Sequence, residues 1–347
     1  MDCVTAWLGA TPARAAESLR NFLRMGALDG HGMNVVYMFP GQSSRYPGML
    51  PKLTQMSEES RQLVEMASEL LHRDLGAHYR EDNAEAYACN LDVQLGVFLA
   101  NHLFLRLLES AGVTAVGSLG LSLGEWNHLV HIGAISFGDA LLAVAERGAA
   151  YDAGPRGAMA SVFPLTLDEL EPVVAGIQGR GVLEVVNLNS PRQQVISGDT
   201  AAVEEAVRVL EDELGVQAVM IERQVPMHSS LFEPVGARFR QALERVPFQR
   251  PCLPYLPNRL AEFIPEPSSA ELVDLLSSHV HKPVLWARSI DRVVRTWPDL
   301  TLVEVGPKAV LFNLLDRKWH RDVRKLHTDS SKDTAAQLAQ VLQQLRG

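Results

Sequence analysis

Apolar residues along the chain fall into short runs and longer helical stretches. Runs bounded by Gly, Pro or Asn predict strands at 34–39, 113–119 and 302–305. The stretch 93–110 predicts a helix that is too apolar for a surface position. A strand, a tight turn and a helix follow one another at 113–132. These elements predict an α/β protein with a buried helix.

The pattern changes between residues 157 and 222. Strand-like and helical segments alternate there as strand 158–165, helix 167–177, strand 182–188, strand 193–197, helix 201–214 and strand 216–221. This β-α-β-β-α-β order is typical of a ferredoxin-like unit, so a small subdomain is expected to interrupt a larger one. The expected boundaries are an N-terminal extension at 1–32, with a short helix starting at Thr11-Pro12, a large subdomain at 33–155 and 224–347, and the small subdomain at 156–223.

Composition and charge narrow the classes of function. The 347 residues are 47% hydrophobic and 21% charged, which is typical of a folded globular protein. The net charge of -9 makes nucleic acid an improbable partner. Three widely spaced cysteines favour neither a metal site nor a disulfide framework, so we expect a cytoplasmic protein. We expect no membrane span, because the most apolar window, 96–108, is too short to cross a bilayer.

The segment Gly120-Leu121-Ser122-Leu123-Gly124 is the candidate nucleophile site. Glycines on both sides of Ser122 allow the sharp strand-to-helix turn that exposes a nucleophilic hydroxyl at a helix N-terminus. A structural turn is the alternative explanation, because a pattern of five residues recurs by chance. A reactive serine also needs a base, and the chain has 11 histidines. His228 is a candidate because it follows the small subdomain in a loop-like stretch.

Eight sequence blocks stand in a fixed order along the chain. They are Phe39-Pro40-Gly41-Gln42-Ser43-Ser44-Arg45, Gly120-Leu121-Ser122-Leu123-Gly124-Glu125, Arg147-Gly148, Gly157-Ala158-Met159-Ala160, Asn187-Leu188-Asn189-Ser190-Pro191 with Val195-Ile196-Ser197-Gly198, Val225-Pro226-Met227-His228, Lys282-Pro283-Val284-Leu285-Trp286 and Glu304-Val305-Gly306-Pro307. From about residue 34 onwards the chain thereby resembles the malonyl-CoA:acyl carrier protein transacylases and the acyltransferase domains of polyketide and fatty acid synthases.

The resemblance implies a fold and a catalytic pair. The fold is an α/β-hydrolase-like large subdomain with an inserted ferredoxin-like small subdomain, and the active site lies between them. Ser122 would be the nucleophile and His228 its base, oriented by a main-chain carbonyl near His279 rather than by a carboxylate. The backbone N–H groups of Gln42 and Leu123 would form the oxyanion hole.

The resemblance also implies an acyl pocket. Arg147 stands where the malonyl enzymes place the arginine that binds the free carboxylate of the substrate. Met227 matches a position that selects the substituent on the acyl chain. Leu121, Tyr151 and His279 depart from the family's usual residues and would lie near the acyl group, so they could alter substrate choice.

The function implied is transfer of an acyl group, malonyl by preference, from CoA through a Ser122 acyl-enzyme to the phosphopantetheine thiol of an acyl carrier protein or carrier domain, in polyketide or fatty acid biosynthesis. No cofactor or metal is needed. The alternatives are a hydrolase that clears carrier thioesters, a transferase for an unusual acyl group between carriers, and a degenerate docking module. Basic residues crowd together at 317–325, as either a carrier-binding patch or a solvated helix face.

Overall fold

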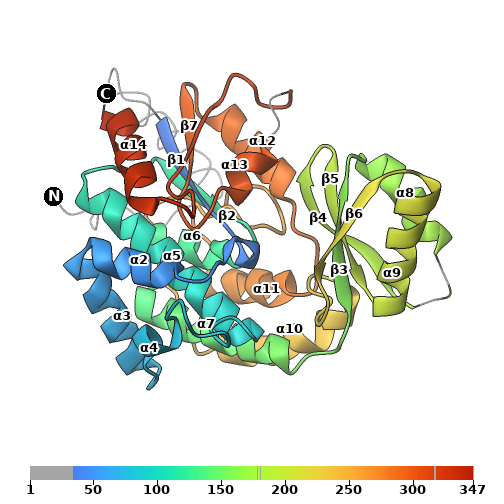
Figure 1. The fold of residues 1–347 in the computed structure, drawn as a ribbon, viewed down its shortest axis with the longest axis horizontal. Helices are drawn as coiled ribbons and strands as arrows, with labels where there is room; N and C mark the ends of the chain where they lie inside the picture. The colour runs from blue at the N-terminus through green and yellow to red at the C-terminus, as the bar shows by residue number, and fades with distance from the viewer. Residues whose placement is uncertain (1–33, 178, 180, 316–317, 347) are drawn as a thin grey trace.

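The computed structural model describes residues 34–177, 179, 181–315 and 318–346. The helix predicted after Thr11-Pro12 lies outside these residues. The described chain folds into a large and a small subdomain, each built on its own sheet (Figure 1). The predicted α/β class is confirmed.

The sheet of the large subdomain is parallel, and its strands follow the order β2-β1-β7-β8. These strands are β1 (Asn34–Phe39), β2 (Gly117–Gly120), β7 (Leu300–Glu304) and β8 (Arg324–His327). Every residue of β1 is buried, as expected for a central parallel strand covered on both faces. Because the strands are parallel, the loops after β1 and β2 leave the sheet at the same edge, and this edge carries the candidate site.

Helices pack around this sheet (Figure 1). They are α2 (Met49–Met56), α3 (Glu58–Leu70), α4 (Leu75–His78), α5 (Asn90–Ser110), α6 (Gly124–His131), α7 (Phe137–Asp152), α10 (Glu233–Leu243), α11 (Ser269–His279), α12 (Trp286–Thr296), α13 (Val310–Leu314) and α14 (Thr334–Arg346). Helix α5 has the length and apolar composition of a membrane span, but 83% of its apolar window is buried inside the fold. It is the buried helix that the sequence predicts.

The small subdomain contains the predicted β-α-β-β-α-β order. Its elements are β3 (Ala158–Phe163), α8 (Leu167–Gly176), β4 (Leu183–Ser190), β5 (Gln193–Gly198), α9 (Thr200–Arg208), a π-helical turn (Val209–Glu213) and β6 (Gln217–Glu222). The antiparallel sheet has the order β4-β5-β3-β6, and a separate apolar core lies between the sheet and its helices.

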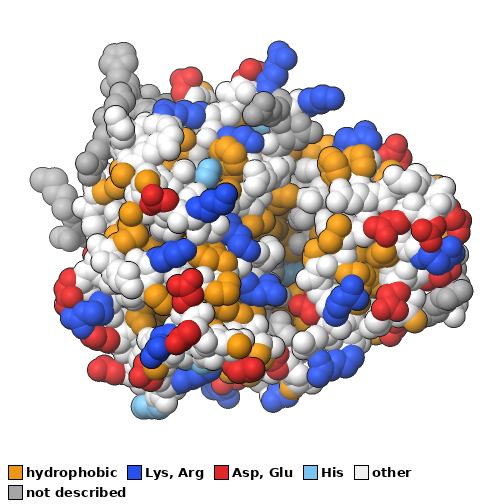
Figure 2. All heavy atoms as spheres, viewed as in Figure 1, with side chains coloured by type: hydrophobic (Ala, Val, Ile, Leu, Met, Phe, Trp, Pro, Cys, Tyr) orange, Lys and Arg blue, Asp and Glu red, His pale blue; other side chains and the backbone are white. Residues whose placement is uncertain are grey.

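Backbone hydrogen bonds join the two subdomains. Val284, just before α12, donates to the carbonyl of Val186 at 2.8 Å, and Leu188 donates to the carbonyl of Val284 at 3.0 Å. The strand β4 is thus tied to the segment between α11 and α12. On the face shown in Figure 2 a groove separates the two subdomains.

Candidate active site

The turn at Ser122 depends on its two flanking glycines. A Cβ atom on Gly120 would lie 2.0 Å from the carbonyl oxygen of Gly124, and one on Gly124 would lie 2.0 Å from that of Phe39. Ser122 itself has φ +50°, in the left-handed region that is costly for a residue with a side chain. The turn between β2 and α6 therefore has the geometry of a strained nucleophile elbow.

Ser122 and His228 meet across 106 positions of sequence. The distance from Ser122 Oγ to His228 Nε2 is 2.8 Å, and His228 Nδ1 lies 2.8 Å from the carbonyl oxygen of His279. A carbonyl only accepts, so Nδ1 carries the proton and Nε2 is free to accept the serine hydroxyl. Burial, with the nearby His279 and Arg147, lowers the pKa of His228 well below the ordinary histidine value. The imidazole is therefore a neutral base at pH 7.

The loop that carries His228 is fixed by its backbone. His228 has φ +64°, and its N–H donates to the carbonyl of Val280 at 2.9 Å. The hydroxyl of Ser229 donates to the carbonyl of Pro226 at 2.7 Å, which closes the turn. The end of α11 thus holds the histidine through both its main chain and its ring.

Two backbone N–H groups beside Ser122 have no acceptor in the described part of the chain. They belong to Leu123, which follows the nucleophile, and to Gln42, which follows Gly41 in the loop after β1. A Cβ on Gly41 would lie 2.9 Å from the carbonyl oxygen of Leu121, so only glycine lets this loop approach the elbow so closely. The two predicted oxyanion donors are thus carried by segments in close contact.

Arg147 is a buried cation beside Ser122. Its side chain, on α7, donates to Gln94 Oε1 at 2.6 Å and to Ser122 Oγ at 3.4 Å, and its guanidinium lies 4.4 Å from the centre of the Tyr151 ring. No described carboxylate forms an ion pair with it, and burial lowers its pKa. The direct contacts of the guanidinium are all neutral, and Glu125 acts on it only from a longer distance, so the cation is suited to receive an anionic group.

The other predicted pocket residues are buried in different surroundings. Leu121 belongs to the apolar cluster under the sheet that includes Val284, whereas Met227 belongs to the main core of the large subdomain. Tyr151 packs under Arg147, and burial raises its pKa. The side chain of His279 lies against Glu125, and the His228 and His279 ring centres are 5.0 Å apart.

Sequence reasoning did not single out Gln94 and Asn258. Gln94 Oε1 holds the guanidinium, and Asn258 Oδ1 accepts from the backbone N–H of Ser122 at 2.8 Å. Both are buried polar residues among apolar neighbours, which is the only signal in the sequence that could have drawn attention to them.

A cavity of about 100 Å³ borders the oxyanion loop. Gln42, Arg45 and Asn90 line it on the large subdomain, and Glu222 and Gln224 line it at the end of β6. The cavity therefore lies between the two subdomains, next to the candidate site.

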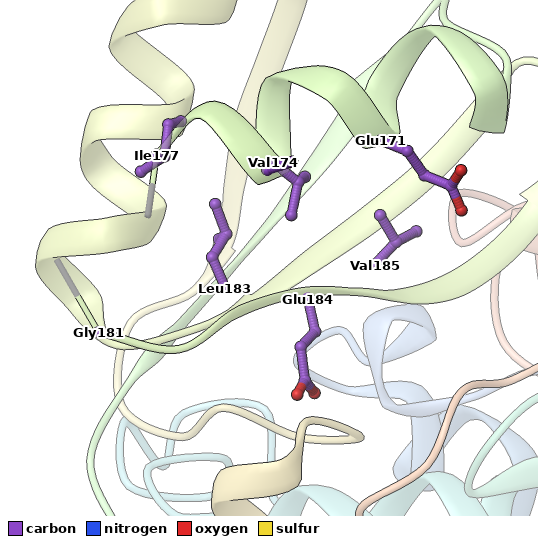
Figure 3. Close-up of a pocket in the computed structure, with 8 residues that line it drawn as sticks. Glu171, Val174, Ile177, Gly181, Leu183, Glu184 and Val185 are labelled. Carbon is purple, nitrogen blue, oxygen red and sulfur yellow. The ribbon is translucent and has the colours of Figure 1, made fainter. Parts of the chain in front are cut away.

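A second cavity, of about 330 Å³, lies within the small subdomain between α8 and β4 (Figure 3). The side chains of Val174, Ile177, Leu183 and Val185 make its wall apolar. The Glu184 carboxylate points to the other side of β4, where it accepts from the N–H of Ser230 at 2.8 Å. With no cation in its lining, this cavity offers no partner for the carboxylate of an acyl group.

The described residues of the basic cluster, 318–325, do not lie on a helix. Arg324 and Lys325 belong to β8, and the Lys325 ammonium donates to the carbonyls of Phe312 and Leu315 at 2.9 and 2.7 Å. For these residues the interpretation as a solvated helix face is therefore wrong, and Lys325 stabilises the fold through these two hydrogen bonds. Within the described residues no three His, Cys, Asp or Glu side chains form a group that could hold a metal ion.

Comparisons with known proteins identify a family. The family model of the acyl transferase domain matches residues 36–343. The chain is 30% identical over 286 residues to the malonyl CoA-acyl carrier protein transacylase of Escherichia coli (strain K12), covering 81% of this chain and 91% of that protein. It is 29% identical over 288 residues to the transacylase of the same name from Bacillus subtilis (strain 168), covering 82% and 90%.

Solved structures resemble the whole fold. The crystal structure of FabD from Acinetobacter baumannii matches with a TM-score of 0.82 at 28% identity, covering 91% of this chain and 99% of that one. A malonyl-transacylase solved in complex with a holo type II polyketide synthase acyl-carrier protein matches with a TM-score of 0.81 at 26% identity, covering 90% and 99%. Since the family model spans nearly the whole described chain, this protein belongs to the acyl transferase domain family.

Proposed function

We propose that this protein transfers a malonyl group from CoA to the phosphopantetheine thiol of an acyl carrier protein in fatty acid or polyketide biosynthesis. The observation that carries the proposal is the buried Arg147 guanidinium, which lies 3.4 Å from the Ser122 hydroxyl and has no carboxylate partner among the described residues. A free carboxylate on the acyl group would supply the missing anion. The names of the relatives and the complex with a carrier protein support this substrate and partner.

In the first half-reaction Ser122 Oγ attacks the thioester carbonyl of malonyl-CoA while its proton moves to His228 Nε2. The negative charge that develops on the carbonyl oxygen is stabilised by the N–H groups of Gln42 and Leu123. The C–S bond then breaks, the proton passes from His228 to the departing sulfur, and CoA leaves with Ser122 carrying a malonyl ester.

The second half-reaction runs through the same groups in reverse. His228 takes the proton of the carrier thiol, the sulfur attacks the Ser122 ester, and the serine oxygen leaves with the proton from the histidine. All the proton transfers are made by one side chain, so the cycle needs neither a metal nor an organic cofactor. The two described cysteines, Cys89 and Cys252, are unpaired, which agrees with a cytoplasmic location.

Intact-mass measurement tests the proposal. Incubation with malonyl-CoA should add one malonyl group to the protein, a holo carrier protein should remove it and become malonylated, and Ser122→Ala should abolish the adduct. Absence of an adduct with any acyl-CoA would contradict the acyl-enzyme. Rapid loss of the adduct to water, with no malonyl carrier formed, would instead assign the protein as a thioester hydrolase.

A further inference from the structure

A buried polar cluster made of Glu125, Tyr255, Asn258 and His279 lies behind the catalytic pair, and we call it the Glu125 cluster. Its centre is the Glu125 carboxylate, which is 1% exposed. Oε1 accepts from the Tyr255 hydroxyl at 2.6 Å and from the Asn258 backbone N–H at 3.1 Å, while Oε2 lies 2.7 Å from His279 Nδ1. One carboxylate thus contacts two distant segments of the chain, 255–258 and the end of α11.

On one side the cluster holds the nucleophile. The Asn258 side chain accepts from the Ser122 N–H at 2.8 Å and donates to the carbonyl of Gly120 at 2.6 Å. These contacts fix both ends of the elbow while Ser122 keeps its left-handed conformation. Glu125 in turn fixes Asn258 by accepting its backbone N–H.

On the other side the cluster holds the base. His279 is the last residue of α11, and its carbonyl accepts from His228 Nδ1 at 2.8 Å. The His279 side chain faces Glu125 and is 2% exposed, so its ring is confined between the carboxylate and His228. Displacement of this ring would move the carbonyl that orients the base.

The contacts form a closed circuit. It runs from Ser122 through Asn258, Glu125 and His279 to His228, and it closes with the 2.8 Å contact between His228 and the serine hydroxyl. A carboxylate suits the centre of the circuit because it only accepts hydrogen bonds and has room for several donors. A carboxyl group excluded from water is costly unless polar partners surround it, which argues for a specific task at this position.

We propose that the Glu125 carboxylate and the His279 side chain are positioning groups that keep Ser122 and His228 at reacting distance. Glu125 supports the nucleophile through Asn258, and its contact with the His279 ring holds in place the carbonyl that orients the base. Neither residue need touch the substrate. The proposal rests on the proposed function only in taking Ser122 as the nucleophile. It does not depend on which acyl group the enzyme carries.

Three substitutions at the base side and the nucleophile side test the circuit. His279→Leu removes the polar contact with Glu125, His279→Gln keeps a polar side chain that can reach that carboxylate, and Asn258→Ala removes the support of the elbow. Ser277→Ala is the matched control, because Ser277 is also buried on α11 and its hydroxyl donates only to the helix carbonyl of Asp274. Thermal melting of each variant identifies any loss of folded protein.

The first readout is the rate constant for modification of Ser122 by a fluorophosphonate, which requires no acyl substrate. We expect it to fall about 10- to 100-fold in His279→Leu and Asn258→Ala, to recover to within about threefold of the natural protein in His279→Gln, and to stay unchanged in Ser277→Ala. With malonyl-CoA, kcat should fall in parallel while KM changes less than about threefold.

An unchanged fluorophosphonate rate in folded His279→Leu would overturn the proposal. So would a reduced rate that His279→Gln does not improve, because a merely space-filling role explains that result. The test is separate from that of the proposed function: if malonyl-CoA fails to acylate the protein but the fluorophosphonate rate still depends on His279, the positioning role stands and the proposed substrate is wrong.

Discussion

Replacement of Arg147 by methionine separates the recognition of the substrate from the support of the fold. Methionine is long, flexible and apolar, so it can occupy the space of the arginine stem without introducing a charge. The variant loses the donors to Gln94 Oε1 and Ser122 Oγ and the contact with the Tyr151 ring. It also removes a cation whose pKa burial lowers, that is, a charge that is costly to bury.

The structure sets the size of each effect. Two charge-assisted hydrogen bonds to a malonyl carboxylate are together worth about 3–5 kcal/mol, so kcat/KM for malonyl-CoA should fall about 100- to 1,000-fold or more. For the free protein, relief from the buried charge is worth about 1–4 kcal/mol, while the unpaired Gln94 oxygen and the lost ring contact cost a similar amount. Stability should therefore change by less than about 2 kcal/mol.

Steady-state rates with malonyl-CoA and acetyl-CoA, together with urea unfolding, measure both quantities. Acetyl-CoA has no free carboxylate, so its kcat/KM should stay within about threefold of the natural protein. Arg156→Met, at an exposed arginine, is the control for the loss of a positive charge. An equal fall in kcat/KM for malonyl-CoA and acetyl-CoA would refute the reasoning, because it would mean that Arg147 acts on Ser122 rather than on the acyl carboxylate.

Three further predictions follow from burial and backbone geometry. Because the pKa of His228 lies well below 6.5, the imidazole stays neutral as the pH falls through 6.5. The fall of kcat/KM on the acid side of the pH profile should therefore occur below pH 6.5. A fall at or above pH 6.5 would contradict the assignment of His228 as the base. Burial raises the pKa of Glu304 to about 8, so the folded state holds a proton at pH 7 that the unfolded state releases, and stability is lost as the pH rises from 4.5 to 8. Glu304→Gln should remove this loss, so the free energy of unfolding should rise by about 3 kcal/mol at pH 7 but by less than 1 kcal/mol at pH 5. Urea unfolding measures both values, and an equal gain at the two pH values would contradict the raised pKa of Glu304. Gly124→Ala should abolish acylation and lower the melting temperature, because the new Cβ would lie 2.0 Å from the Phe39 carbonyl oxygen. Gly176→Ala is the control and should change neither property, because no atom lies within 4 Å of the Cβ it adds. An active Gly124→Ala protein would contradict the description of the elbow.

Most of the fold was predictable because apolar runs mark its buried strands. The strand predicted at 34–39 is β1 itself, and the order of elements in the small subdomain is as expected. The strand predicted at 113–119 is instead β2, Gly117–Gly120, because Val113 packs in the core without pairing. Its carbonyl accepts the Tyr37 hydroxyl at 3.1 Å, so the apolar character of this segment comes from packing rather than from a ladder.

The support of the site was harder to predict than its reacting groups. Ser122 and Arg147 stand in recognisable motifs, whereas Asn258 and Gln94 are single polar residues whose contacts are with residues distant in sequence. Local periodicity carries no information about such pairs. Glu125 is part of the elbow motif, but its partners come from segments more than 100 residues away, so only the folded chain reveals its surroundings.

Ser122 and His228 share a strained backbone conformation. A left-handed conformation costs a residue with a side chain about 1–2 kcal/mol, and both Ser122, at φ +50°, and His228, at φ +64°, adopt it. Other described residues share this conformation, among them Lys308 at φ +63°, so strain alone does not identify a site. What sets Ser122 and His228 apart is that two strained residues, 106 positions apart, meet side chain to side chain at 2.8 Å. Two strained backbone conformations that together allow one side-chain contact are expected where function, rather than stability, has selected the conformation.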